Sequence, residues 1–273
     1  LKGIETLEEF FGVDLAQRLA DRGRQADLMV ANNVLAHVPD INDFVKGFAI
    51  LLKPHGVATF ELPHLMQLIE QKQFDTIYHE HFSYLSFRTV HQIFRTNGLS
   101  VFDVEELDTH GGSLRVFAQR SDAGTQAVSG KVADLLEREA AAGMNKAAYY
   151  RGFQEQANKV KNDFLVFLLE AARQGKTVAA YGAAAKGNTL LNYAGIRPDL
   201  LPYVVDKNPN KQGKYLPGSR IPIVSEDHLR KQRPDYVVIL PWNLKAEIME
   251  QLSYVRDWGG RFVTAVPELQ IVK

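Results

Sequence analysis

The sequence has 273 residues, 45% of them hydrophobic, which is enough to bury the cores of one or two domains. Its 32 lysines and arginines balance 32 acidic residues, and a zero net charge argues against binding nucleic acid through excess positive charge. The absence of cysteine excludes disulfides and thiolate metal sites, and no apolar run is long enough to cross a bilayer, so we expect a cytoplasmic protein.

The first part of the chain alternates helical and strand patterns. Apolar residues at helical spacing predict a helix over residues 5–20, and an apolar run predicts a strand over residues 27–31. A second helix is predicted over residues 38–52 and a second strand over residues 57–62. Strand–helix units of this length predict a parallel sheet with helices on both faces.

A hairpin-like pair of strands is expected to complete this sheet at its edge. Residues 78–82 are predicted to form a loop, and residues 86–96 a helix. Strands are then expected over residues 99–107 and 113–120, joined through a glycine-containing turn.

A second α/β pattern follows a long helical stretch. Residues 128–173 are charged and alanine-rich, and we expect two helices with a break near Gly143. We place a boundary in the polar stretch before them, giving domains of residues 1–122 and 123–273. Further strands are predicted at residues 176–181, 201–205, 236–240 and 261–266.

The densest group of chemically active side chains lies within residues 74–84. His79 and His81 flank Glu80, so in an extended segment the two imidazoles share one face. A histidine with a pKa near ~6.5 can act as a base at neutral pH, and a neighbouring carboxylate can orient its ring. We interpret the group as catalytic rather than as a polar surface loop. A metal site of the His-x-His type, helped by His37, His64 or His110, is the less favoured alternative.

Two other stretches are candidates for ligand binding. Residues 32–40 follow a predicted parallel strand, where ligands of open α/β sheets bind, and they place His37 before a helix. Residues 109–115 contain paired glycines, which permit a sharp turn or a close approach of the backbone, although a simple hairpin turn would need no function.

A fourth candidate is the small-residue turn at residues 181–188. Such a turn between strand and helix can present backbone N–H groups to a phosphate, and Lys186 could add positive charge. Asp206, which ends the next strand, is placed to meet a ribose hydroxyl. Three lysines within residues 207–215 also favour an anionic ligand. The turn is not a GxGxxG motif, so a close-packed turn without a ligand remains an equal alternative.

Together these stretches resemble the sugar-nucleotide C-methyltransferases of deoxysugar biosynthesis. The resemblance lies in residues 33–40, 61–64, 78–86, 109–115, 181–188 and 205–208. It implies an α/β protein in which residues 1–122 form part of a Rossmann-like methyltransferase domain that binds S-adenosylmethionine. Residues 123–273 would form a helical segment and a second Rossmann-like domain that holds a nucleotide-sugar.

Members of this family begin with a small zinc-binding module. Neither its cysteines nor the glycine-rich first turn of the S-adenosylmethionine site is found in this sequence. We therefore expect an N-terminally truncated chain with an incomplete S-adenosylmethionine site, and zinc only in the missing module.

The resemblance also implies a reaction and its residues. The methyl group would pass to a carbon next to the ketone of a keto-deoxysugar linked to a nucleotide, expected to be thymidine diphosphate, through an enolate. His81 would be the base, supported by Tyr78, Glu80 and His37. The cofactor would contact Ala31, Asn32, Asn33, Ala36 and His37. The substrate would contact His110, Gly111, Arg115, Tyr181, Gly182, Lys186, Asn188, Asp206, Lys207 and Tyr215.

Three alternatives stay open at this point. A nicotinamide-dependent oxidoreductase could use the Gly182 turn and Asp206 for its cofactor. A methyltransferase of the same fold could act on oxygen or nitrogen, because one scaffold serves several acceptors. A nucleotide-binding regulatory module would make no catalytic use of His81.

Overall fold

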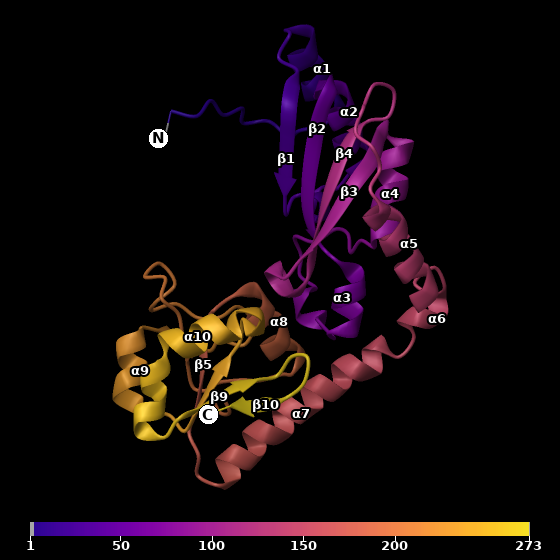
Figure 1. The fold of residues 1–273 in the computed structure, drawn as a ribbon. Helices are drawn as coiled ribbons and strands as arrows, with labels where there is room; N and C mark the ends of the chain where they lie inside the picture. Colours follow the sequence, from indigo (N-terminus) through magenta and orange to yellow (C-terminus); the bar gives the residue numbers. More distant parts are fainter. Residues whose placement is uncertain (1–2, 273) are drawn as a thin grey trace. The chain divides into compact units, whose positions relative to one another are not determined.

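The computed structural model describes residues 3–272, and its internal contacts divide the chain into two compact units. The first unit comprises Leu1–Gln67 and Glu80–Tyr150, and the second comprises Leu68–His79 and Arg151–Lys273. Both units are mixed α/β structures (Figure 1). No helix in the described part of the chain has the length and apolar character needed to span a membrane.

The first unit is built on a four-stranded sheet in the order β1-β2-β4-β3. Its strands are β1 (Ala26–Asn32), β2 (Leu52–Pro63), β3 (Leu99–Leu107) and β4 (Ser113–Arg120). Strands β1 and β2 are parallel, whereas β4 is antiparallel to both β2 and β3. The parallel pairing expected of the strand–helix units is found between β1 and β2, and the predicted hairpin is found as β3 and β4. Of the two hairpin strands only β3 lies at the edge, because β4 pairs with β2 inside the sheet.

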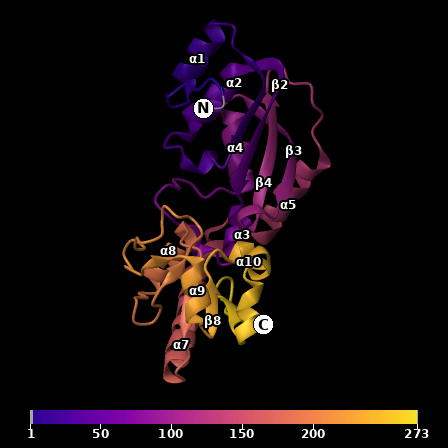
Figure 2. The same cartoon turned by 90° about the vertical axis from the view of Figure 1, so that its left-hand side faces the viewer.

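The helices of the first unit are α1 (Val13–Asp21), α2 (Ile41–Leu51), α4 (Phe87–Thr96), α5 (Gly130–Ala142) and α6 (Ala147–Tyr150), while α3 (Leu65–Glu70) crosses into the second unit. Three of them, α2, α4 and α5, pack on the sheet, and α1 packs against α2. In Figure 2, α2 and α4 lie on the same side of the sheet. Their buried faces and that of α5 belong to a single core, so among the described residues the predicted helices on both faces are not found here.

Local sequence explains where these helices begin. The side chain of Asp40 accepts hydrogen bonds from Asn42 N and Asp43 N at the start of α2, and Ser86 caps α4 through Thr89 N. The helix predicted over residues 5–20 begins only at Val13, and of the apolar residues before it Phe11 packs against the core while others do not. Phe10, for example, is fully exposed.

Phenylalanines fill the centre of the first core. The rings of Phe48 and Phe60 have centroids 4.6 Å apart, and Phe94 lies 4.6 Å from Phe60 on the other side. Along β2 the buried positions alternate, with Ala58, Phe60 and Leu62 facing the core. This rigid layer supports the loops at the ends of the strands.

The second unit contains a six-stranded sheet in the order β10-β9-β8-β5-β6-β7. The strands are β5 (Val178–Tyr181), β6 (Val204–Val205), β7 (Ile223–Val224), β8 (Tyr236–Ile239), β9 (Arg261–Thr264) and β10 (Gln270–Val272), and all pairs are parallel except β10 with β9. The helices are α7 (Phe153–Arg173), α8 (Ala185–Tyr193), α9 (Glu226–Gln232) and α10 (Lys245–Gln251).

Both faces of this sheet are covered. Val178 and Ala180 of β5 join a core with α7 and α8, whereas Ala179 and Tyr181 join a core with α9 and α10. Alternate residues of a strand point to opposite faces, so a strand buried on both faces reads as a continuous apolar run. The prediction of a second Rossmann-like α/β unit is confirmed.

The division of the contacts differs from the expected boundary after residue 122. Val132 and Leu135 of α5 pack in the first core, so the first unit extends to Tyr150. The long helical stretch breaks at Gly143, as predicted, where φ is 87°. The segment Leu68–His79 joins the second unit because its apolar residue Phe74 is buried in the second core.

Candidate functional site

Residues 32–40 and 109–115, together with residues 80–84 of the histidine-rich stretch, belong to the first unit and lie at one edge of its sheet. Strands β1, β2 and β3 run in the same direction, since β1 is parallel to β2 and both β2 and β3 are antiparallel to β4. They end at Asn32, Pro63 and Leu107, so the residues that follow them gather at the carboxyl edge of the sheet. Ligands of open α/β sheets bind at this edge.

Two of the predicted catalytic residues are brought together there. His37 ends the short 3₁₀ helix Leu35–His37, and its ring centroid lies 4.8 Å from that of His81 at an interplanar angle of 74°. The carbonyl oxygen of Ala36 accepts hydrogen bonds from Phe82 N at 2.8 Å and Ser83 N at 3.3 Å. These backbone contacts fix the histidine-containing loop to the 3₁₀ helix.

The surroundings of His81 include a second aromatic ring. Both His37 and His81 are half-buried, and the ring of Tyr84 lies 5.8 Å from His81, edge to face. Glu80 is exposed. Tyr78, the fourth predicted catalytic residue, belongs to the second unit and is half-buried.

The residues predicted to contact the cofactor surround the end of β1. Ala31 and Ala36 are buried and Asn32 is exposed. Asn33 has a left-handed backbone with φ of 55°, and its N–H donates to Glu61 O at 2.7 Å. A non-glycine residue in this region needs support from its surroundings, and the bond to β2 supplies it.

Glu61 is a residue of this edge that was not among the candidates. Its carboxylate is 7% exposed and accepts hydrogen bonds from Thr109 Oγ1 at 3.1 Å and Arg115 Nη2 at 3.2 Å. Arg115 also lies 3.7 Å from Glu105. In the sequence, Glu61 could have been noticed as an acidic residue near the end of an otherwise apolar strand. The structure places the predicted substrate residue Arg115 directly opposite Glu61 on β4.

The turn after β3 is tightly folded. His110 is exposed and left-handed with φ of 56°, and Gly111 and Gly112 have φ of 91° and 114°. A Cβ at Gly112 would come within 2.6 Å of Gln67, so this position requires glycine. The predicted substrate residues His110 and Gly111 thus sit on a constrained turn beside Glu61.

His64, considered as a metal ligand, has a structural partner. Its Nε2 lies 2.8 Å from Glu139 Oε1, and that carboxylate also accepts hydrogen bonds from Phe87 N and Arg88 N at the start of α4. Burial acts to raise the pKa of Glu139, but these hydrogen bonds together hold it below its usual value. Among residues 3–272 no three potential ligands gather around a metal position.

In the second unit, the turn at residues 181–188 closes on itself. Gly182 has φ of 93°, and a Cβ there would lie 2.5 Å from Pro241 Cδ. Asp206, expected to meet a ribose hydroxyl, accepts hydrogen bonds from Ala183 N at 2.8 Å and Lys211 Nζ at 3.2 Å. The carboxylate of Asp206 therefore has a structural role in this loop, so Asp206 no longer favours a nicotinamide cofactor.

Lys186 was expected to contact a phosphate, which would require an exposed ammonium group. In the structure its side chain is buried. Its Nζ lies 3.0 Å from Asn243 Oδ1 and 4.5 Å from the centroid of the Trp242 ring. Burial lowers the pKa of Lys186, and the charge of Asp75 opposes that effect.

The remaining predicted substrate residues of this unit differ in exposure. Lys207 and Tyr215 are exposed. Asn188 is half-buried, and its Oδ1 has no hydrogen-bond partner among the described residues. The hydroxyl of Tyr181 is hydrogen-bonded by Gln251 Nε2, so it serves the packing of the strand.

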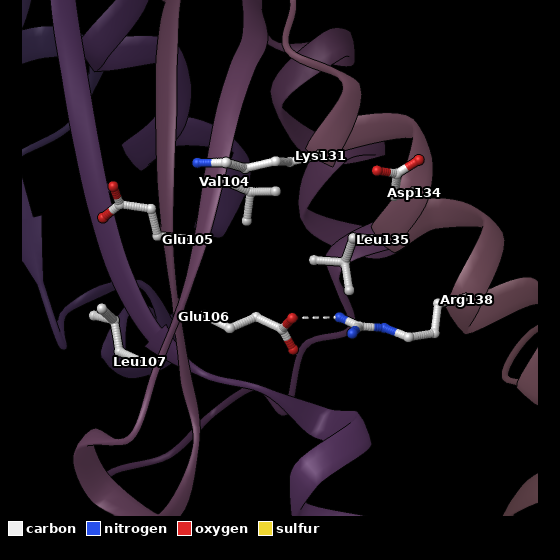
Figure 3. A pocket seen from close by; sticks show the side chains of 8 residues that line it. All are labelled: Val104, Glu105, Glu106, Leu107, Lys131, Asp134, Leu135 and Arg138. Carbon is white, nitrogen blue, oxygen red and sulfur yellow. Dashed lines mark ion pairs between the residues drawn. The ribbon is translucent and has the colours of Figure 1, made fainter.

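Two cavities lie away from these residues. One of about 580 Å³ opens between β3 and α5, where Arg138 forms a 2.6 Å ion pair with Glu106 (Figure 3). Its lining residues are Val104, Glu105, Glu106, Leu107, Lys131, Asp134, Leu135 and Arg138. The other, of about 480 Å³, lies against α7 in the second unit. Neither is lined by a candidate site residue, so the candidate site is the open carboxyl edge of the first sheet.

Comparison with known proteins shows the family of the chain. A family described as the C-methyltransferase C-terminal domain matches residues 108–267, and one described as a methyltransferase domain matches residues 5–104. NovU, a C-methyltransferase of Streptomyces niveus, is 37% identical over 99% of the chain, and the chain spans 64% of the length of that relative.

Solved structures share parts of the fold. The N-methyltransferase NodS from Bradyrhizobium japonicum is 16% identical over 36% of this chain and 52% of its own, with a TM-score of 0.27. The M1.HpyAVI–SAM complex is 10% identical over 43% of this chain and 54% of its own, with a TM-score of 0.28. These similarities are too low to carry an argument about the site. On the sequence matches to its two halves, the chain belongs to the C-methyltransferase family.

Proposed function

We propose that this protein transfers the methyl group of S-adenosylmethionine to the carbon next to the ketone of a nucleotide-linked keto-deoxysugar. Membership of the C-methyltransferase family supports transfer to carbon, and the relative NovU carries that activity in its name. The observation that carries the proposal is the pairing of the His37 and His81 rings at the carboxyl edge of the first sheet.

The residues at the end of β1 fit an adenosyl ligand in their chemistry. Asn32 presents an exposed side-chain amide that can both donate and accept hydrogen bonds, and the small side chains of Ala31 and Ala36 leave the backbone accessible at close range. When bound there, S-adenosylmethionine supplies an electrophilic methyl group on a positively charged sulfur.

His81 acts on the sugar. A carbon next to a ketone becomes nucleophilic when it loses a proton, because the electron pair spreads onto the carbonyl oxygen. The neutral imidazole of His81 accepts that proton and leaves a carbon nucleophile, which would take the methyl group as its bond to the sulfur breaks and S-adenosylhomocysteine is released. Base catalysis of this kind contributes roughly 10²–10⁴-fold to the rate.

His37 and Tyr78 support the base and the enolate. The edge-to-face ring of His37 restricts the orientation of His81, which keeps the accepting nitrogen in place for reaction. We assign the phenol of Tyr78 to the enolate oxygen, because a hydroxyl donor there stabilises the developing charge. Glu80, being exposed, is assigned to orienting the sugar or His81.

The second unit is assigned to the nucleotide. Lys207 and Tyr215 are exposed on the loop that follows β6, where a cation and an aromatic ring can contact a diphosphate and a base. Calorimetric titration with thymidine diphosphate checks this assignment. Tyr215→Ala is expected to weaken binding on the order of tenfold, and unchanged binding would remove Tyr215 from the site.

The test of the reaction uses His81→Ala. This variant should lose methylation of a keto-sugar nucleotide while its affinity for S-adenosylmethionine stays near that of the wild type. His55→Ala is the matched control, since His55 is exposed near the opposite end of β2. Wild-type turnover in His81→Ala would refute the base assignment.

A further inference from the structure

The segment that leads into the catalytic loop is anchored in the second unit. Within Leu68–His79, the 3₁₀ helix Phe74–Thr76 packs against α8. Phe74 is buried in the core of that unit, with its ring centroid 5.2 Å from that of Tyr193. This aromatic contact anchors the segment in the core, but another apolar side chain at position 74 could do the same.

Asp75 makes a contact that is more specific. Its carboxylate is completely buried, and Oδ2 accepts a hydrogen bond of 2.7 Å from Trp242 Nε1. Trp242 begins the 3₁₀ helix Trp242–Leu244, and the ammonium of Lys186 lies over its ring. Asp75, Trp242 and Lys186 therefore form one buried cluster.

A buried carboxylate at this position lowers the stability of the fold, which suggests that it has a function. Burial raises the pKa of Asp75 to about 6, although the Trp242 hydrogen bond and the charge of Lys186 oppose the rise. The other oxygen, Oδ1, has no hydrogen-bond partner among the described residues. A buried polar group with unsatisfied bonding costs stability, and such departures from good packing are expected where function requires them.

The position of the cluster indicates what that role is. Asp75 lies only a few residues before Tyr78 and His81, and Lys186 belongs to the turn at residues 181–188. The cluster thus ties the start of the catalytic loop to the loop that we expect to hold the nucleotide.

We propose that Asp75 is a positioning residue, whose hydrogen bond to Trp242 fixes the segment that carries Tyr78 and leads directly into His81. The catalytic meaning of this positioning rests on the proposed function. The mechanical part, that Asp75 restrains residues 76–79, does not. The bond orients a donor and an acceptor in a water-poor interior, where hydrogen bonds are strong.

Hydrogen exchange of the full protein tests the mechanical part. Asp75→Ala removes the acceptor and Trp242→Phe removes the donor, so both should speed exchange of the amides at residues 76–79 on the order of tenfold, which corresponds to about 1.4 kcal/mol. Asp75→Asn retains an acceptor for Trp242 and should exchange like the wild type. Trp258→Phe is the matched control, because its indole donates to Pro234 O elsewhere in the same unit.

Turnover measurements test the catalytic part. In Asp75→Ala and Trp242→Phe, kcat should fall on the order of tenfold while the KM for the methyl donor stays constant, and Asp75→Asn should restore kcat. Wild-type exchange at residues 76–79 in a folded Trp242→Phe would overturn the proposal, and faster exchange with unchanged kcat would overturn its catalytic part. A wild-type protein that methylates no keto-sugar would refute the proposed function, while the exchange data would still decide whether Asp75 restrains the segment.

Discussion

The imidazole rings of His37 and His81 lie edge to face with their centroids 4.8 Å apart, although they come from different loops of the first unit. Both loops are held in place by the fold. The 3₁₀ helix of His37 follows β1, and the loop of His81 is bound to it through the carbonyl oxygen of Ala36. The pair therefore occupies a defined place at the carboxyl edge of the sheet, where a ligand can reach half-buried rings.

His37 is expected to act mainly by orienting His81. His37→Phe retains a ring of similar shape and should lose little activity if orientation is its main role, whereas His37→Ala should lower kcat about a hundredfold. Steady-state kinetics on both variants measures this difference. Equal, large losses in the two variants would instead assign His37 a proton or hydrogen bond of its own.

Glu61 should prove important for the geometry of the substrate edge. Glu61→Ala leaves Thr109 and Arg115 without their buried acceptor, and we expect the KM for the sugar acceptor to rise on the order of tenfold. Glu105→Ala is the control, because Glu105 contacts the same arginine at 3.7 Å from a more exposed position. Identical kinetics in the two variants would show that Glu61 has no special role.

Glu139 should make the first unit sensitive to acid. Its pKa lies below the ordinary value of 4.5 in the folded protein, so it stabilises the fold above that pH, and the contribution is lost as the pH falls further. Glu139→Ala is expected to cost about 3 kcal/mol at neutral pH, because His64 and two N–H groups lose a buried partner.

Urea unfolding at pH 7 and pH 4, followed by circular dichroism, measures the Glu139 contribution. Glu137→Ala on the exposed face of the same helix serves as the control. The interpretation fails if the Glu139 variant shows the same loss of stability between the two pH values as the wild type.

Asp75 should have the opposite pH dependence. The folded protein holds this proton up to about pH 6, whereas the unfolded chain releases it near 3.8. Between these values the folded state binds more protons, so the unfolding free energy decreases as the pH rises, by about 3 kcal/mol at most. Asp75→Asn should remove this decrease. The substitution also removes the negative charge of Asp75, a charge that raises the pKa of Lys186.

Tryptophan emission isolates this effect, because both tryptophans, Trp242 and Trp258, lie in the second unit. Denaturant unfolding at pH 4.5 and pH 7 should show a smaller difference in Asp75→Asn than in the wild type. Asp163→Asn, a change in a surface ion pair with Lys159, is the control. A variant that keeps the full pH dependence of the wild type would contradict the assignment.

Much of the fold could be predicted from local patterns. Strands β3 and β4 occupy the residues that alternation predicted, because each packs one face on a core. The helix over residues 5–20 was overextended, since periodicity indicates an apolar face but not whether anything covers it. The hairpin of β3 and β4 was predicted, but not that β4 rather than β3 would pair with β2, because strand order depends on tertiary packing.

Some residues of the candidate site could be predicted from the sequence, and others could not. His37 and His81 were recognisable because their residue types carry the chemistry, and the fold had only to bring them together. Lys186 was recognised as a candidate but was expected at the loop surface, and Asp75 was given no role of its own, because only tertiary packing buries them beside Trp242. Glu61 depends on a cross-strand partner, which a sequence pattern does not specify.

Proton abstraction by His81 can be measured apart from methyl transfer. The keto-sugar nucleotide is incubated with the protein in deuterated buffer, with S-adenosylhomocysteine in place of the methyl donor, and deuterium at the carbon next to the ketone is followed by NMR. The wild type and His55→Ala should incorporate deuterium well above the rate without protein, and His81→Ala should not. Incorporation by His81→Ala at the wild-type rate would contradict the assignment of His81 as the base.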